Sequence, residues 1–294
     1  MIARILGAGA GGGLPQWNCG CRNCQDARRG ILPQMTQSSV AVSADETTWV
    51  VLNASPDIRS QLGATPALAP LGLRGTPISS VVLTNGDIDH IAGLLTLRER
   101  TAFEICATAD ILDILRENGV FRVLSDDLVR YRRIELDAPF SAAGLTFRAF
   151  AVPGKVALFK EGETVETSAI GGQTIGLEIH DGAKRLFYVP GCAALPDWLI
   201  AELARGDAVL FDGTVWEDDD MRRTGTGEKT GTRMGHLPMS GPEGSIARLA
   251  GIPGQKIFIH INNTNPVLQP DSAERAALIA ASWRIAQDGM ELRP

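Results

Sequence analysis

Three cysteines lie close together near the N-terminus, at Cys19, Cys21 and Cys24. Thiolates bind Zn²⁺ tetrahedrally at about 2.3 Å, and the C-x-C-x-x-C spacing lets three of them face one point. Reduced surface thiols are the alternative, but exposed clustered thiols oxidise readily, so we favour a metal site. Three thiolates leave no obvious catalytic role. We therefore expect a structural zinc that pins the loop from Gly9 to Gln25, with a fourth ligand from elsewhere in the chain.

A second group of candidate ligands follows a predicted strand, in the segment TNGDIDHIAGL at 84–94. Its Asp87, Asp89 and His90 lie on one turn, and oxygen and imidazole ligands at this spacing suit a metal ion. Aspartates at the start of a helix also serve as N-terminal caps. The residues by themselves leave these two interpretations equally open.

Three further candidates stand at the ends of predicted elements. His236 precedes a predicted helix, whereas His260 and Asp212 each end a predicted strand. A histidine in an apolar strand is more often a core residue than a ligand, but the carboxyl ends of strands are where sites form in α/β sheets. We therefore keep His260 as a candidate ligand. Cys106 is interpreted as a buried small hydrophobe, and Cys192 is ambiguous.

Two glycine-rich segments bear on where a site lies. The run GAGAGGG at 7–13 does not predict a nucleotide site, because no G-K-[ST] follows it and no helix clearly begins there. We expect its glycines to let the backbone pass close to a site. The polar stretch at 216–236 is either a loop beside a site or a solvated excursion, and its composition favours the second.

The elements that must position these residues alternate at first and then become mostly strands. Two mixed sheets covered by helices on their outer faces fit this order, and four such layers hold nearly 300 residues in one domain. The predicted strands span 2–6, 39–42, 49–53, 78–83, 103–107, 130–136, 145–152, 174–180, 185–189, 208–211 and 256–261. The predicted helices include 92–98, 109–117, 196–204, 242–250 and a long one through 286 capped by Asp271.

Composition excludes several classes of protein. The chain has 294 residues, of which 44% are hydrophobic and 21% charged, as in ordinary globular proteins. The net charge is -6 without a basic face, so nucleic acid is not an expected partner. No apolar stretch has the roughly 20 residues of a membrane span, and the N-terminus does not read as a signal peptide. Five cysteines make no disulfide framework, and we expect a cytoplasmic protein.

Several motifs of the chain resemble those of the metallo-β-lactamase superfamily. TNGDIDHIAGL is similar to the segment T-H-x-H-x-D-H-x-x-G-L of that fold. Along nearly its whole length the chain resembles one branch of that superfamily, the B-protein family of pyrroloquinoline quinone (PQQ) biosynthesis. The motifs that carry this resemblance are GAGAGGGLPQWNCGCRNC, TQSSVAVS, NASPDIRSQL, MGHLPMSG and IHINNTNP. The resemblance implies a single α/β (α+β) domain over 1–294, built as a four-layer αββα sandwich.

The chain departs from the hydrolases of this fold at three positions. Asn85 and Asp87 stand where those enzymes have their first two histidines, and Lys155 stands where a third would be. The resemblance therefore implies that one metal site has lost its histidines. Ordinary two-metal hydrolysis would lack half of its ligands.

The second metal site of the fold is matched by Asp89, His90 and, at its last position, His260. Two histidines and one carboxylate form the facial triad of non-haem Fe(II) oxygenases, which leaves coordination positions for substrate and O₂. His260 could instead complete the cysteine zinc site. In that case iron would draw on His236 or Asp212, and the sequence leaves this choice open.

The resemblance implies a role in PQQ formation. We favour an iron-dependent oxygenase that hydroxylates the tyrosine-derived ring of a Glu-Tyr precursor, because that ring must gain oxygen before the quinone forms. The alternative is a carrier of PQQ or its precursor toward the periplasm, and residual hydrolysis is the least favoured interpretation. The electron donor and the oligomeric state, including any homo-oligomer, stay open.

In the oxygenase interpretation the remaining candidates have supporting roles. His236 and Asp212 would act as acid–base groups or orient the metal ligands. Asp87 would join the metal or orient water. Lys155 would meet a substrate carboxylate as a point charge.

Overall fold

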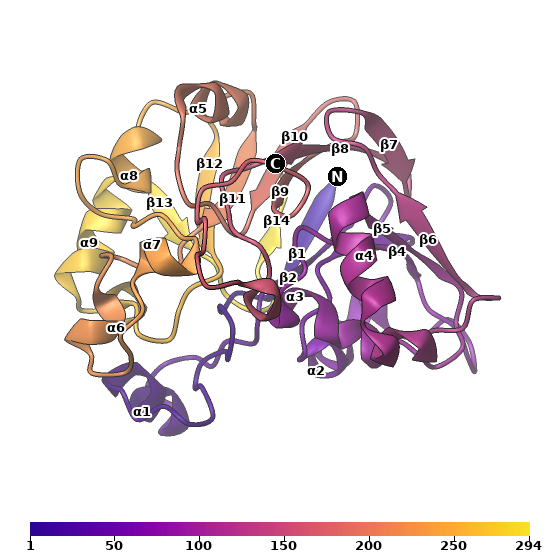
Figure 1. Ribbon diagram of the computed structural model, residues 1–294, viewed down its shortest axis with the longest axis horizontal. Helices are drawn as coiled ribbons and strands as arrows, with labels where there is room; N and C mark the ends of the chain where they lie inside the picture. Colours follow the sequence, from indigo (N-terminus) through magenta and orange to yellow (C-terminus); the bar gives the residue numbers. More distant parts are fainter.

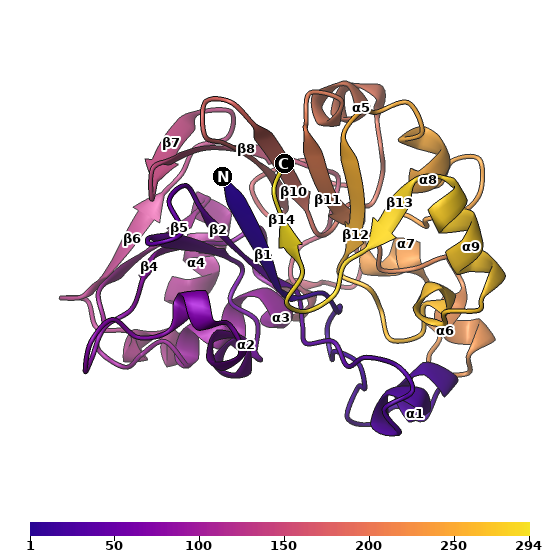
Figure 2. The same ribbon diagram turned by 180° about the vertical axis from the view of Figure 1, so that it is seen from behind.

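The computed structural model describes residues 1–294 and contains two seven-stranded sheets packed face to face, with helices on their outer sides (Figures 1 and 2). The strand order is β14-β1-β2-β3-β4-β5-β6 in the first sheet and β13-β12-β11-β10-β9-β8-β7 in the second. Both sheets mix parallel and antiparallel neighbours, so the expected four-layer sandwich is confirmed.

The first sheet is antiparallel from β14 to β3 and parallel from β3 to β6. Its central strands are continuous apolar runs because both faces are covered, as the fully buried WVVL of β3 illustrates. The strands are β1 (Ile2–Gly7), β2 (Ser39–Ser43), β3 (Trp49–Leu52), β4 (Ile78–Val82), β5 (Phe103–Ala107), β6 (Val129–Arg133) and β14 (Glu291–Leu292).

The second sheet is antiparallel from β7 to β10 and parallel from β10 to β13. Its parallel strands β10, β11 and β12 therefore end at one edge. The strands are β7 (Pro139–Ala142), β8 (Leu145–Ala151), β9 (Ile175–His180), β10 (Arg185–Val189), β11 (Ala208–Asp212), β12 (Gln255–Ile259) and β13 (Trp283–Ile285).

The helices are short and lie outside the two sheets, while the segment of α1 projects from the body (Figures 1 and 2). None of them has both the length and the apolar content to cross a membrane. They are α1 (Arg22–Arg28), α2 (Ile58–Ala64), α3 (Ile88–Ile91), α4 (Ala109–Glu117), α5 (Asp197–Leu203), α6 (Asp220–Arg223), α7 (Gly231–Met234), α8 (Ser245–Arg248) and α9 (Ala273–Ala280), with short 3₁₀ turns η1 (Pro66–Leu68), η2 (Ala92–Leu95), η3 (Gly119–Val123), η4 (Leu158–Lys160) and η5 (Pro266–Leu268).

The helix expected at 92–98 is placed wrongly by the sequence pattern. The helical segment begins four residues earlier, as α3, and continues only as the 3₁₀ turn η2 to Leu95. Gly93 explains the tight packing of this turn, because a Cβ atom there would lie 2.1 Å from the carbonyl oxygen of Ser55. Asp89 and His90 are thereby moved from a loop into the first turn of a helix.

The last helix is also shorter than expected. α9 ends at Ala280, and residues 283–285 pair with β12 as strand β13. Trp283 stacks on Phe258 with ring centroids 3.8 Å apart, so the apolar residues assigned to a helix face form a sheet edge instead. The N-terminal cap is Ser272, whose hydroxyl accepts from the backbone N–H of Arg275, and not Asp271. The helix expected at 242–250 is reduced to the four residues of α8.

The glycine-rich segment after β1 joins the two sheets at the edge where the strands end. Ala10 N donates to Ile261 O at 2.9 Å, and Ile261 N donates to Ala8 O at 2.9 Å. Gly9 forms bridges with both Gln37 and Ile261. The residues after β1 are thus tied to those after β12, which brings the two sheet ends together.

Candidate metal centre

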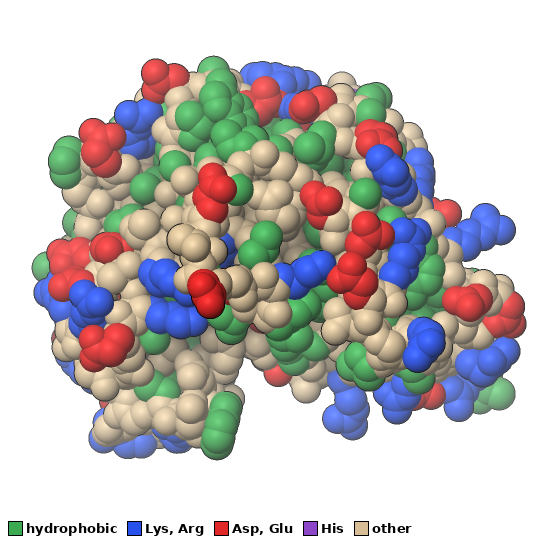
Figure 3. All heavy atoms as spheres, in the orientation of Figure 1, with side chains coloured by type: hydrophobic (Ala, Val, Ile, Leu, Met, Phe, Trp, Pro, Cys, Tyr) green, Lys and Arg blue, Asp and Glu red, His purple; other side chains and the backbone are tan.

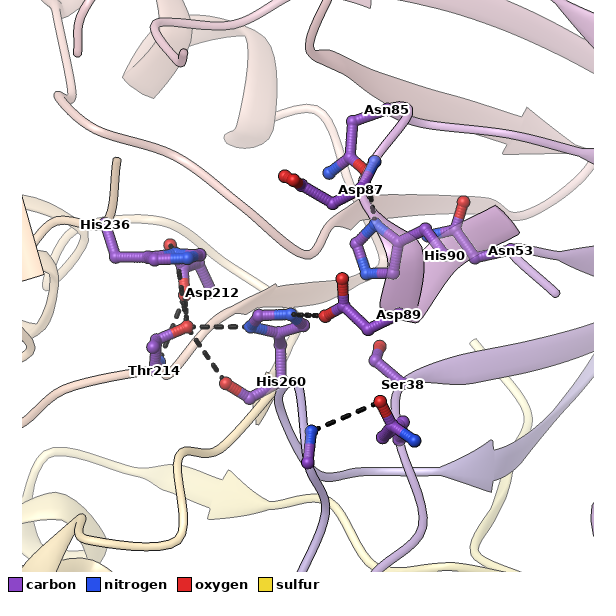
Figure 4. A network of polar contacts seen from close by, with 12 residues as sticks. Ser38, Asn53, Asn85, Asp87, Asp89, His90, Asp212, Thr214, His236 and His260 are labelled. Atoms are coloured by element: carbon purple, nitrogen blue, oxygen red, sulfur yellow. Dashed lines mark hydrogen bonds and ion pairs between the residues drawn. The ribbon is translucent and has the colours of Figure 1, made fainter. Parts of the chain in front are cut away.

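Side chains from both sheets converge at this edge (Figure 4). Asp89 and His90 lie on α3, directly after β4 of the first sheet. Asp212 ends β11, His260 follows β12, and His236 follows α7, all in the second half of the chain. No histidine side chain is seen on the face of the molecule drawn in Figure 3, and His90 and His260 are buried.

Asp89, His90 and His260 form one compact group. One ligand atom from each lies within 4.8 Å of the other two. His260 Nε2 is 3.1 Å from Asp89 Oδ2, and the rings of His90 and His260 are 5.3 Å apart. His90 Nε2 is buried and has no hydrogen-bond partner. A buried ring nitrogen without a partner is costly in a protein, so its presence beside a carboxylate and a second imidazole fits a bound metal ion.

The glycine run approaches this group as its composition predicts. A Cβ atom at Gly11 would lie 3.3 Å from Asp89 Oδ2, which is tight for a carbon beside a carboxylate oxygen. Gly11 and Ala10 both line the cavity in front of Asp89. The absence of a side chain at Gly11 therefore keeps the carboxylate accessible.

The ionisation of the group follows from burial and from mutual interaction. Burial opposes the charge on Asp89, but its interactions with His90 and His260 outweigh burial and hold its pKa below the ordinary value. Burial lowers the pKa of His90 to about 4, so this ring is neutral at pH 7. Burial acts in the same direction on His260, but the hydrogen bond and charge of Asp89 prevail and raise its pKa.

Asp212 and His236 form a second pair on the other side of His260. Asp212 is fully buried, and its Oδ2 lies 2.7 Å from His236 Nδ1. Its two oxygens also accept from Cys192 N, from Thr214 N and from the Thr214 hydroxyl. Burial opposes its charge, but His236 and the hydrogen bonds outweigh burial and lower its pKa.

Asp212, His236 and His260 also have ligand atoms within 4.8 Å of one another. The oxygens of Asp212 are already satisfied by four hydrogen bonds, whereas His90 Nε2 in the other group has no partner. The set Asp89, His90 and His260 is therefore the better fit for a metal ion.

A cavity of about 220 Å³ opens in front of these groups. Its wall carries both signs of charge, since Lys155, Lys229 and Arg233 face the same space as the carboxylates. It is lined by Ala10, Gly11, Asn85, Asp87, Asp89, His90, Lys155, Leu158, Glu161, Gly191, Thr214, Lys229, Arg233, Met234, His236, His260 and Asn262. Asp212 does not line the cavity, but its hydrogen-bond partners His236 and Thr214 do.

Lys155 is not a free cation. Its Nζ lies 3.0 Å from Glu161 and 4.0 Å from Asp87, and Arg233 binds the same Glu161 at 2.8 Å. The hydrogen bond from Arg233 is the largest influence that lowers the pKa of Glu161 to about 2, with a further contribution from Lys155. Asp87 in turn accepts from Leu158 N at 2.8 Å, so it ties η4 to the cavity wall.

The polar stretch at 216–236 was expected to be a solvated excursion, and this expectation is wrong. The stretch carries α6 and α7 and supplies Lys229, Arg233 and His236 to the cavity. Composition could not reveal this because charged residues that line a site and charged residues in solvent have the same sequence signature. Lys229, Arg233 and Thr214 are site residues that sequence reasoning missed.

The cysteines form a separate cluster on the loop before and within α1. Cys19, Cys21 and Cys24 have sulfur atoms within 4.8 Å of one another. The side-chain amide of Asn263 lies 3.2, 3.6 and 3.3 Å from these three sulfurs, in that order.

His260 was the other candidate for this cluster, but its ring nitrogens contact Asp89 and Thr214. The two clusters are thus adjacent along one segment but use different residues of it. Cys106 and Cys192 are both buried elsewhere.

Comparison with known proteins agrees with this fold. Residues 48–261 match the family model described as the β-lactamase superfamily domain. The chain is 56% identical over 289 residues to the coenzyme PQQ synthesis protein B of Ruegeria pomeroyi, with 98% of each chain covered. It is 55% identical over 299 residues to the protein of that name from Methylobacterium nodulans, with 100% of each covered.

Solved structures give the same result. The 1.98-Å crystal structure of Zn²⁺-bound PqqB from Methylobacterium extorquens matches with a TM-score of 0.98 and 52% identity, covering all of both chains. A diphosphatase of the PhnP family matches with a TM-score of 0.70 at 20% identity, covering 100% of this chain and 97% of that one, and so shares the fold.

Proposed function

The chain belongs to the coenzyme PQQ synthesis protein B family of the β-lactamase superfamily, and on that premise we propose that it hydroxylates the tyrosine-derived ring of a Glu-Tyr precursor of PQQ with one Fe(II) ion. The observation that carries the proposal is the group of one carboxylate and two imidazoles, with an unpartnered His90 Nε2, at the wall of a cavity. At the positions where hydrolases of this fold have the histidines of a second metal site, this chain has Asn85, Asp87 and Lys155.

Asp89, His90 and His260 would hold the ion, and Fe(II) in such a site supplies the activation of O₂. These residues fit iron because imidazole and carboxylate are ligands that Fe(II) accepts. The overall conversion adds one oxygen atom of O₂ to a ring C–H. The other oxygen atom leaves as water, so the reaction consumes two electrons and two protons from an external reductant.

The cavity wall provides the means to bind an anionic precursor. Lys155, Lys229 and Arg233 line the space in front of Asp89, and the precursor would carry several carboxylates. Charge-assisted hydrogen bonds in a partly enclosed site are stronger than neutral ones. A substrate carboxylate at Lys155 would share that ammonium with Glu161, which lies 3.0 Å from it.

His236 is the group we assign to proton transfer. It lines the cavity, and Asp212 holds its Nδ1 at 2.7 Å, so the other ring nitrogen is available to a phenol in the cavity. Asp212 is fully buried and acts through His236, as the partner that orients the ring. Asp87 is engaged by Leu158 N and lines the cavity, where it would orient water or the precursor.

We further propose that Cys19, Cys21 and Cys24 hold a structural zinc. The three sulfurs converge within 4.8 Å, and Asn263 is the side chain that contacts all of them. Zinc with thiolate ligands stabilises folded loops directly, because the site exists only in the folded chain. The Zn²⁺ reported for the Methylobacterium extorquens protein supports metal binding in this family.

The oxygenase proposal is tested by anaerobic reconstitution with Fe(II), followed by addition of precursor, reductant and ¹⁸O₂. Mass spectrometry should detect labelled oxygen in the ring, and His90→Ala should abolish the label while the cysteine zinc stays bound. A carrier would behave differently. If the iron-loaded chain binds precursor but leaves its mass unchanged in air with reductant present, the carrier interpretation replaces this one.

A further inference from the structure

We propose that Asn85 and Thr214 are positioning residues that keep a hydrogen on Nδ1 of both His90 and His260, so that Nε2 of each ring is the nitrogen left to bind a metal ion beside Asp89. Neither residue belongs to the set of candidate ligands, and both are neutral. The inference rests on the proposed function only in requiring a metal ion at Asp89, His90 and His260. It does not require turnover.

Asn85 determines which ring nitrogen of His90 carries the hydrogen. His90 Nδ1 lies 2.8 Å from Asn85 Oδ1, and the same oxygen accepts from the backbone N–H of Asp87 at 3.0 Å. The orientation of the Asn85 amide is therefore determined, because a backbone N–H requires an acceptor. An amide oxygen cannot donate, so the hydrogen between the two side chains must lie on His90 Nδ1. The lone pair of the neutral ring is then on Nε2, the buried atom without a partner.

Thr214 has the same role at His260, whose Nδ1 lies 2.8 Å from the Thr214 hydroxyl. A hydroxyl has one hydrogen to donate, and Thr214 Oγ1 also lies 2.6 Å from Asp212 Oδ1. Asp212 already accepts backbone N–H groups on both oxygens, so it acts as the acceptor.

The hydrogen of Thr214 therefore points to Asp212, and the hydroxyl oxygen is left to accept from the ring nitrogens beside it, His260 Nδ1 at 2.8 Å and His236 Nδ1 at 3.1 Å. The carbonyl oxygen of His260, 3.0 Å away, is a neutral and more distant acceptor than the carboxylate. His260 Nδ1 consequently carries a hydrogen. Its Nε2 is the atom left to face Asp89 Oδ2, at 3.1 Å.

Asn85 and Thr214 have the same effect on the two histidine rings, although they follow strands of different sheets. Asn85 follows β4, and Thr214 follows β11, yet both contact a ring on its Nδ1 side. Partners that hold the second nitrogen of a metal-binding histidine typically change metal affinity tenfold to a hundredfold, roughly, when removed. We therefore expect these two neutral side chains to control metal affinity at the site.

The first test reads the tautomers directly by NMR. The chain has only four histidines, so the full-length, zinc-loaded protein labelled with ¹⁵N at histidine gives an assignable long-range ¹H–¹⁵N spectrum. His90 and His260 should each show a protonated Nδ1 and a metal-bound Nε2. Coordination through Nδ1 in either ring would overturn the inference.

The second test measures affinity with Mn(II) alone, because a hard ion avoids the thiolate cluster. Free Mn(II) is quantified by EPR with protein that retains one zinc. Thr214→Val, which keeps the shape but removes the hydroxyl, should weaken Mn(II) binding roughly tenfold to a hundredfold, and Asn85→Leu should do the same. Thr214→Ser and Asn85→Asp keep an acceptor for the Nδ1 hydrogen and, unlike Thr214→Val and Asn85→Leu, should retain tight Mn(II) binding.

Thr65→Val is the matched control, since it also deletes a hydroxyl that donates a hydrogen bond, to Gln61 O, away from the site. Its Mn(II) affinity should equal that of the wild type. Melting temperatures of the zinc-retaining variants without Mn(II) identify any loss of folding. Wild-type affinity in folded Thr214→Val and Asn85→Leu, or failure of Thr214→Ser to retain tight binding, would overturn the inference. A chain that lacks hydroxylase activity but shows the expected affinities would contradict only the proposed function.

Discussion

Nε2 of His260 lies 3.1 Å from Oδ2 of Asp89, although 171 positions separate the two residues in the sequence. Asp89 enters from the helix after β4 in one sheet, and His260 enters from the end of β12 in the other. His260 has a left-handed φ of 61°, a conformation that costs on the order of 1–3 kcal/mol outside glycine. The hydrogen bonds of the neighbouring Ile261 to the segment after β1 hold it there.

Substitution of one ligand of this pair should release the iron and leave the zinc bound. We expect Asp89→Ala to lose bound iron after anaerobic loading and gel filtration, because two imidazoles alone hold the ion weakly. Zinc should stay near one per chain. His180→Ala, at the end of β9, is the control and should retain both metals. Loss of zinc together with iron in Asp89→Ala would show that the two sites are not independent.

Cys21→Ser should remove the zinc and lower the melting temperature, since folding and metal binding are coupled at thiolate sites. Metal analysis and thermal unfolding measure the two effects. Cys106→Ala is the matched control, because Cys106 is a buried cysteine outside the cluster. It should change stability without changing zinc content. Unchanged zinc and unchanged melting temperature in Cys21→Ser would contradict a structural site.

Lys155→Met should weaken binding of precursor or PQQ by about 1–3 kcal/mol, the range for a charge-assisted hydrogen bond in a partly buried site. The variant also leaves Glu161 with Arg233 as its remaining cation. Calorimetry provides the affinities. Lys160→Met is the control, because Lys160 pairs with the exposed Glu117 instead of facing the cavity. Equal affinities for wild type and Lys155→Met would refute the assignment.

The pH dependence of stability should contain a contribution from Asp220. Burial raises the pKa of Asp220 to about 6, although Trp216 N and Glu217 N donate to its carboxylate. An acid with a higher pKa in the folded chain than its ordinary 3.8 takes up a proton on folding between the two values. The free energy of unfolding therefore falls as the pH rises through this window.

Asp220→Asn cannot ionise and should lack this contribution. Urea unfolding of wild type and variant at about pH 4 and about pH 7 gives two stability differences. The variant should gain relative to the wild type at the higher pH. The same difference at both pH values would mean that Asp220 titrates normally in the folded chain.

Much of the fold could be predicted because the apolar pattern of each strand is contained in a short segment of the sequence. Apolar runs such as WVVL of β3 can be buried on both faces only inside a covered sheet, so the strand pattern predicts the sandwich. The helix boundaries were less predictable. Residues 283–285 satisfy a helical apolar pattern, but pairing with β12 and stacking of Trp283 on Phe258 make them a strand.

The sequence by itself determined the two candidate metal clusters in part, since three cysteines within one loop and Asp89 next to His90 are held together by the chain alone. Only the tertiary structure decided that His260 lies with Asp89 and that Asn263 lies with the cysteines. It also decided that Lys229 and Arg233 face a cavity. The physical reason is that contacts between distant segments depend on how two sheets pack, and no local pattern records which polar side chain, such as Thr214, ends beside which ring.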